Sequence, residues 1–196
     1  MRARSIIRGK LLLALAGALA VLFAPSGARS QGGAGLVNPA TVVKPQAYVS
    51  TEPVAKGKEF QIAVVVDIAR GFHMNSHKPS DEYLIPTSLT AQLPAGFQLA
   101  DTLYPEGKLE KFSFSPNKAL DVYTGTVTLK MRLMAQGNAP LGPATIPLTL
   151  RYQACNDAAC LPPVKVPVTV PVTIAAAGAK TQAVHPELFS ATDKKS

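Results

Sequence analysis

Cys155 and Cys160 are the only two cysteines in this chain of 196 residues, and they are close enough in sequence to bond to each other. On either side of them, residues 144–152 and 164–174 alternate apolar and polar side chains. Such alternation is typical of half-buried strands. We therefore expect the two cysteines at the turn end of a β-hairpin.

A disulfide across so short a loop has two interpretations. As a structural clip it would add only about 2 kcal/mol, because closing about six residues removes little entropy from the unfolded chain. As a redox pair it would cycle between disulfide and dithiol, and exposed short-loop disulfides are the exchangeable kind. Ala158 and Ala159 leave room for a partner's sulfur, and Pro162 and Pro163 stiffen the exit from the loop. The spacing alone does not decide between them.

The stretch around the cysteines resembles the N-terminal (alpha) domain of DsbD, the bacterial thiol:disulfide interchange protein. The shared pattern is an aromatic residue followed by Gln-x-Cys, a short turn with Asp and Ala, and a second Cys before an aliphatic residue and Pro-Pro. In residues 152–163 it is Tyr-Gln-Ala-Cys-Asn-Asp-Ala-Ala-Cys-Leu-Pro-Pro. Residues 71–79 and 81–86 are also similar to DsbD-like domains, and with the strand order the resemblance covers roughly residues 40 to 175.

This resemblance implies an immunoglobulin-like sandwich that exchanges electrons with periplasmic thioredoxin-like proteins or with a membrane thiol-electron transporter. Cys155 and Cys160 would be the catalytic pair, with Cys160 contacting donor and acceptor and Cys155 resolving the mixed disulfide. The family also has a cap loop whose aromatic side chain shields the disulfide, and Phe112 and Phe114 are the candidates here. An ordinary surface loop with its aromatic side chains in the core is the alternative for that segment.

Four further residues are candidates for supporting the active site. Tyr152 and Asp157 lie in the cysteine stretch, whereas His73 and Asn75 lie in a segment that we expect to be a loop after a strand. His73 and His77 could also suggest a metal such as copper, but histidines four apart share a metal most naturally on a helix. We expect neither a metal nor another cofactor.

Residues 1–30 have the pattern of a signal peptide, with a basic start, an apolar run and the small residues Ala28 and Ser30 before a cleavage site at Gln31. The apolar run of about 14 residues is too short to span a bilayer comfortably. No cysteine lies near the cleavage site, which argues against a lipoprotein. The sequence therefore predicts export to the periplasm, with no membrane anchor after cleavage.

The net charge of +8 comes largely from that segment, which holds five basic residues and no acidic one. The remaining 15 basic and 12 acidic residues give a net charge of +3. No basic cluster with interleaved aromatic residues is present, so nucleic acid is not an expected partner. Export also favours a cysteine disulfide, because such bonds persist outside the cytosol.

The mature length predicts one domain. We expect a flexible leader at 31–40, an all-β sandwich at 41–175 and a disordered tail at 176–196, with at most one helical turn starting at Pro186. Residues 103–118 lack a regular period, which predicts a long loop. The strands are expected at 41–50, 60–68, 88–93, 97–103, 123–133, 144–152 and 164–174.

Pro163, Pro167 and Pro171 share parity in the last of these strands, so their missing N–H groups fall on one side of it. Only an edge strand tolerates this pattern. The cysteine hairpin should therefore lie near an accessible sheet edge of a monomeric protein. The competing function is a non-enzymatic immunoglobulin-like binding or assembly module of the periplasm, with a structural hairpin disulfide.

Overall fold

The structure is a computed structural model that describes residues 37–190. The predicted signal peptide, most of the predicted leader and residues 191–196 lie outside the described residues. The elements are η1 (Pro39–Thr41), β1 (Val43–Val49), β2 (Thr51–Glu52), β3 (Val54–Ala55), β4 (Lys58–Ile68), β5 (His73–Asn75), β6 (Ser88–Ala91), β7 (Phe97–Leu103), β8 (Lys108–Phe112), β9 (Ser115–Tyr123), β10 (Thr126–Ala135), β11 (Gly142–Tyr152), β12 (Ala154–Cys155), β13 (Val164–Ala175), β14 (Gln182–Ala183) and α1 (Pro186–Phe189).

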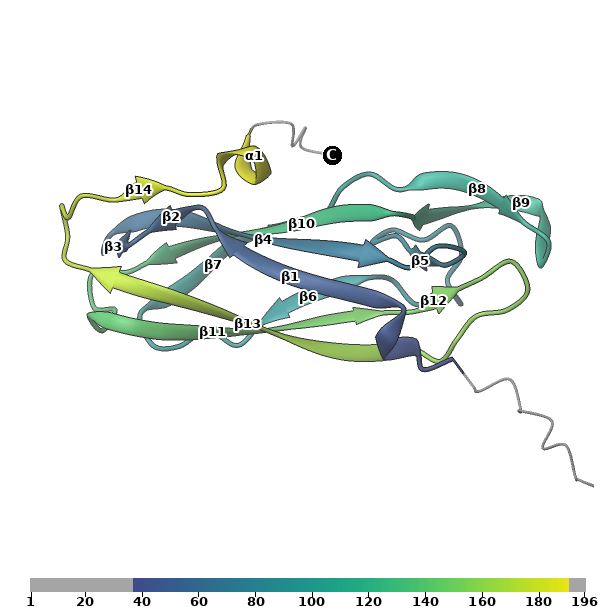
Figure 1. Cartoon of the computed structure of the whole chain (residues 1–196), viewed down its shortest axis with the longest axis horizontal. Helices are drawn as coiled ribbons and strands as arrows, with labels where there is room; N and C mark the ends of the chain where they lie inside the picture. The colour runs from purple at the N-terminus through teal and green to yellow at the C-terminus, as the bar shows by residue number, and fades with distance from the viewer. Residues whose placement is uncertain (1–36, 191–196) are drawn as a thin grey trace, which may run out of the picture. The chain divides into compact units, whose positions relative to one another are not determined.

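Two four-stranded sheets form the body of the domain, in the orders β1-β4-β10-β7 and β3-β13-β11-β6 (Figure 1). Alternate side chains of both sheets point inward and share one hydrophobic core. Each aliphatic side chain buried there contributes about 1.5–3 kcal/mol. The predicted all-β, immunoglobulin-like sandwich is confirmed, and its strongest strands are those with the clearest alternation. In β13 the buried positions are Val168, Val170, Val172 and Ile174.

A third sheet, in the order β12-β5-β9-β8, lies at one end of the sandwich and carries the cysteine hairpin (Figure 1). Beneath it is a small second cluster of buried side chains, separate from the main core. Its members are Leu84, Phe112, Leu120 and Val122. The site region therefore has packing of its own, in which the cap candidate Phe112 takes part.

Three expectations for this end of the chain are corrected by the structure. The predicted long loop at 103–118 contains β8 and the start of β9, because most of β8 faces solvent and leaves no alternation to read. The predicted loop at His73 is strand β5, whose three residues are all buried. The predicted strand 123–133 is broken at Gly125, where φ is 65°, so Tyr123 ends β9 and β10 begins at Thr126.

Strand β13 lies at the edge of its sheet over most of its length, as the proline pattern predicts. It pairs with β11 throughout, from Gly142↔Ile174 to Tyr152↔Val164. On its other side the described residues offer only β3, which pairs with Ile174 and Ala175. The chain leaving the cysteine hairpin thus enters a strand whose outer edge is mostly unpaired, with η1 and β1 packed near it.

The C-terminal segment, expected to be disordered from residue 176, is ordered as far as it is described. Strand β14 pairs with β2, and the ring of His185 contacts Tyr48 at a centroid distance of 4.9 Å. The helical turn predicted at Pro186 is α1. Within residues 37–190, no helix is long and apolar enough to cross a bilayer.

Because the core belongs to the two large sheets, the domain should fold without its disulfide. Replacing Cys155 by Ala and Cys160 by Ser together should cost about 2 kcal/mol, the entropy of a short loop. Alanine is chosen at the buried position 155 because it introduces no new polar group there. Urea unfolding followed by far-ultraviolet circular dichroism measures the cost. Loss of the β-sheet signal in the double variant would instead mark the disulfide as structural.

Candidate active site

The structure joins Cys155 and Cys160 in a disulfide, with the Cα atoms 3.9 Å apart. The two residues face each other across a tight antiparallel turn. The Leu161 N–H donates to the Ala154 carbonyl at 2.8 Å on one side of the pair, and the Asn156 N–H donates to the Ala159 carbonyl at 3.0 Å on the other. The main chain therefore brings the two sulfurs together.

The side chain of Gln153 holds this hairpin to its neighbours. Its Oε1 accepts from Asn75 Nδ2 at 3.2 Å and from the Ile85 N–H at 3.4 Å, while its Nε2 donates to the Leu161 carbonyl at 3.3 Å. Asn75 is fully buried and also donates to the Ile85 carbonyl at 3.0 Å. Asn75 thus acts through Gln153. This residue is part of the sequence motif but is not among the predicted site residues.

The two sulfur-bearing residues differ sharply in exposure. Cys155 is 0 % exposed, whereas Cys160 belongs to the exposed part of the turn. Asp157, Ala158 and Ala159 beside it are exposed as well. A reacting partner from solution can therefore reach the hairpin at Cys160 and not at Cys155.

His73 lies directly opposite Cys155, because β5 pairs with β12 in that register. Opposite residues of an antiparallel pair project from the same face of the sheet. Since Cys155 is also opposite Cys160, the side chains of His73, Cys155 and Cys160 form one row across three chain segments. We call these three residues the redox row.

The His73 ring is 2 % exposed and stacks on Phe112, with 3.9 Å between ring centroids. Phe114 lies further out, 6.3 Å from the same ring. Burial lowers the pKa of His73 from 6.5 to about 4, and the negative charge of Asp157 partly opposes that shift. His73 is therefore a neutral imidazole at neutral pH.

The two cap candidates lie at the turn between β8 and β9, and they are not equivalent. Phe112 is 9 % exposed and belongs to the small second cluster, whereas Phe114 is 38 % exposed. Between them, Ser113 Oγ donates to the Asp157 carbonyl, which links the cap to the cysteine turn. The structure thus brings both phenylalanines over the His73 end of the redox row, while Cys160 stays exposed.

Tyr152 is placed at the base of the hairpin and away from this cap. Its hydroxyl donates to the Pro39 carbonyl at 2.8 Å, and burial raises its pKa to about 12. His77 stacks on Tyr104, with 3.6 Å between centroids, and its Nδ1–H donates to the Thr87 carbonyl at 3.0 Å. Among residues 37–190, no group of three or more His, Cys, Asp or Glu side chains could hold a metal ion.

Residues 40–172 match the family described as the N-terminal part of the thiol:disulfide interchange protein DsbD. The chain belongs to this family. The predicted resemblance to the DsbD N-terminal domain is thereby confirmed over well more than half of the sequence. No curated protein matches the chain.

Among solved structures, the N-terminal periplasmic domain of ScsB from Proteus mirabilis aligns with a TM-score of 0.44 at 13% sequence identity. The alignment covers 64% of this chain and 46% of that one. This chain therefore matches less than half of the length of the ScsB domain structure.

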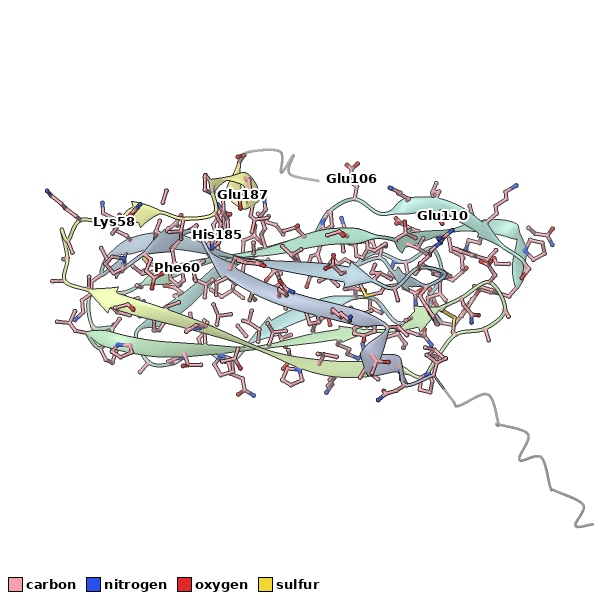
Figure 2. All side chains as sticks on the ribbon, in the orientation of Figure 1. Lys58, Phe60, Glu106, Glu110, His185 and Glu187 are labelled. Carbon is pink, nitrogen blue, oxygen red and sulfur yellow. A yellow bond between two sulfur atoms is a disulfide. The ribbon has the colours of Figure 1, made fainter. Side chains whose placement is uncertain are left out.

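In this member of the DsbD N-terminal family, a pocket of about 430 Å³ opens beside the redox row. His73, Phe112 and Asp157 line it on the side of the disulfide, and Arg70 and Glu110 line it as well. Figure 2 shows Glu110 on β8, above the end of the domain that carries the cysteine hairpin. The pocket therefore lies at the His73 end of the row.

The lowered pKa of His73 makes stability depend on pH in a defined direction. The unfolded chain takes up a proton near pH 6.5 and the folded chain only near pH 4, so stability is full above 6.5 and falls as the pH drops toward 4. The loss should reach up to about 3 kcal/mol. Chemical unfolding at several pH values would measure it.

The matched control is His73→Gln, which removes the titrating group but keeps a polar side chain. As the pH falls from 6.5 toward 4, the protein with His73 should lose more unfolding free energy than the His73→Gln variant. The same result is expected in an Asp157→Asn background, where the facing carboxylate is absent. Parallel pH curves for the two proteins would contradict the assignment.

Proposed function

We propose that this chain is a periplasmic thiol:disulfide interchange domain that passes reducing equivalents to or from thioredoxin-like oxidoreductases. The observation that carries the proposal is the unequal exposure of a bonded pair: Cys160 is open to solvent and Cys155 is 0 % exposed. A purely structural clip has no need of one accessible sulfur. Membership of the DsbD N-terminal family supports the same reaction.

The exchange would run through Cys160. A partner thiolate attacks Cys160 Sγ, the bond to Cys155 breaks, and its electron pair passes to Cys155 Sγ as a thiolate. A second partner thiol then attacks the mixed disulfide, so that Cys160 leaves as a thiolate and the partner becomes a disulfide. Two electrons and two protons reach the cysteine pair in total, and every step can run in reverse.

The electron source or acceptor would be a thioredoxin-like protein or a membrane thiol-electron transporter. Such partners carry a reactive cysteine on an exposed surface, and the cysteine turn offers a matching exposed surface of small residues. Directly after the turn the chain enters β13, whose outer edge is unpaired over most of its length and would add main-chain groups to a docking surface. Export by the predicted signal peptide would place the protein in the periplasm with them.

Trapping of mixed disulfides tests the exchange and the roles of the two sulfurs together. A Cys155→Ala variant should accumulate a mixed disulfide with a periplasmic thioredoxin-like protein whose second active-site cysteine is replaced by serine, because neither Cys155 nor a second partner thiol is then present to resolve the bond to Cys160. The Cys160→Ser variant should trap little, since Cys155 is buried. Non-reducing electrophoresis and mass spectrometry identify the bonded cysteine. Trapping chiefly through Cys155 would reverse the roles, and the absence of any trapping would favour the binding or assembly module.

The cap can be tested separately, because its two rings are packed differently. In a Cys160→Ser background, Phe114→Ala should speed alkylation of Cys155 several-fold, since it uncovers the His73 end of the redox row. Its cost in stability should be under about 1 kcal/mol, as expected for a surface side chain. Phe112→Ala should cost about 3 kcal/mol or more, because it empties a packed cluster. Mass spectrometry follows the alkylation, and an unchanged rate for Phe114→Ala would remove its role as a cap.

A further inference from the structure

We propose that His73 is the thiolate-stabilising residue of the site, which donates its ring N–H to the Cys155 sulfur when the disulfide opens. The inference rests on the proposed exchange reaction, since it assigns a role in one of its steps. It concerns the sulfur that the partner does not touch, and it explains how negative charge can form on a residue that is 0 % exposed.

The register of the strands puts the imidazole beside this sulfur. Cys155 and His73 are direct partners in the β12–β5 pair, and such partners have Cβ atoms about 4.5–5.5 Å apart on one face. The ring also lies near the charge of Asp157, two residues beyond Cys155. His73 therefore lies along the buried side of the redox row, across from Cys155.

The ring has a nitrogen ready for a new hydrogen bond. His73 Nε2 is buried, and within residues 37–190 no hydrogen-bond partner lies in reach of it in the disulfide form. A buried polar atom without a partner is unfavourable and is rare in native proteins. A disulfide sulfur is a weak acceptor, whereas a thiolate is an anion that forms strong, charge-assisted hydrogen bonds. The nitrogen would gain its partner only when the disulfide opens.

The chemistry needs a hydrogen bond and no proton transfer. As the S–S bond breaks, its electron pair moves to Cys155 Sγ, and the imidazole keeps its proton on Nε2 while sharing it with the sulfur. The stacking of Phe112 fixes the ring, so that no reorganisation is needed as the charge forms. In the reverse reaction the same hydrogen bond would hold Cys155 as the thiolate that attacks the mixed disulfide.

The other charged groups near His73 make such a donor necessary. The Asp157 carboxylate faces the ring and would repel a thiolate on Cys155. Glu110 adds a second carboxylate to the neighbouring pocket, and Arg70, the cation of that pocket, is an exposed residue. From the β8–β9 cap, Phe112 and Phe114 cover the ring without offering a hydrogen bond. His73 is then the polar group placed to stabilise the thiolate.

The test measures the acid dissociation constant of the Cys155 thiol, from the ultraviolet absorbance of the thiolate, in a Cys160→Ser background. His73→Phe keeps the ring stack but removes the N–H, and should lower that constant about tenfold or more, as expected for one hydrogen bond to a charged group. His73→Gln retains a side-chain N–H and should restore most of the difference. Phe112→Leu retains the His73 N–H but removes the aromatic stack on the ring, so it serves as the packing control.

An unchanged acid dissociation constant in His73→Phe would overturn the proposal. An equally lowered constant in His73→Phe, His73→Gln and Phe112→Leu would overturn it as well, because that result indicates an effect of packing alone. Should the Phe variant not fold, imidazole nitrogen NMR of the intact His73 decides. Its Nε2 signal must shift as Cys155 ionises, and a signal that does not respond refutes the donor. These readouts need no partner protein, so they stand even where mixed-disulfide trapping fails and the exchange function with it.

Discussion

The site depends on the hydrogen bonds of the side-chain amide of Gln153. The cysteine hairpin rests on β12, a strand of two residues, and so short a strand has little stability of its own. Gln153 connects both sides of the hairpin, because it accepts from Asn75 and Ile85 and donates to Leu161 beyond the second cysteine. The position of the redox row is thus set from outside the disulfide and can persist when the disulfide opens.

This arrangement gives the two sulfurs different surroundings at little structural cost. Cys155 faces β5 and the buried His73, whereas Cys160 lies on the outer side of the turn. A nucleophile from solution must attack the outer sulfur, and the negative charge then forms on the inner one. Apolar surroundings disfavour a buried thiolate. The unfavourable step of the exchange is therefore the formation of a thiolate at the buried Cys155, and the residues around that sulfur determine how stable the thiolate is.

The sequence predicts the large sheets well because their strands have one buried and one exposed face. The strands β4, β10, β11 and β13 follow from alternation, the β11–β13 hairpin follows from the short segment between its strands, and the edge position of β13 follows from its prolines. The strands it misses lack that signal. All three residues of β5 are buried, whereas β14 pairs through main-chain atoms with both side chains exposed. Alternation reports burial on one face only, so such strands cannot be read from it.

The residue types of the candidate site follow from the sequence, but their arrangement does not. Residue types and the motif identified Cys155, Cys160, His73, Asn75 and Asp157, all of which the structure brings to one end of the domain. The roles of the individual residues depend on register, which composition does not encode. A shift of one residue between β5 and β12 would turn His73 to the opposite face, away from Cys155.

The packing of the β8–β9 hairpin determines which part of the candidate cap can move most easily. Moving the whole β8–β9 hairpin would expose the second cluster, at about 1.5–3 kcal/mol for each large side chain. Moving the turn alone loses the stacking of Phe114 on Phe112 and on His73, about 0.5–1.5 kcal/mol for each pair, and the hydrogen bond from Ser113 to the Asp157 carbonyl, of similar size. Opening at the turn is therefore favoured, and Phe112 stays on His73 while it occurs. The His73 ring is thereby held still by Phe112, whereas the turn that carries Phe114 opens at a lower cost in free energy.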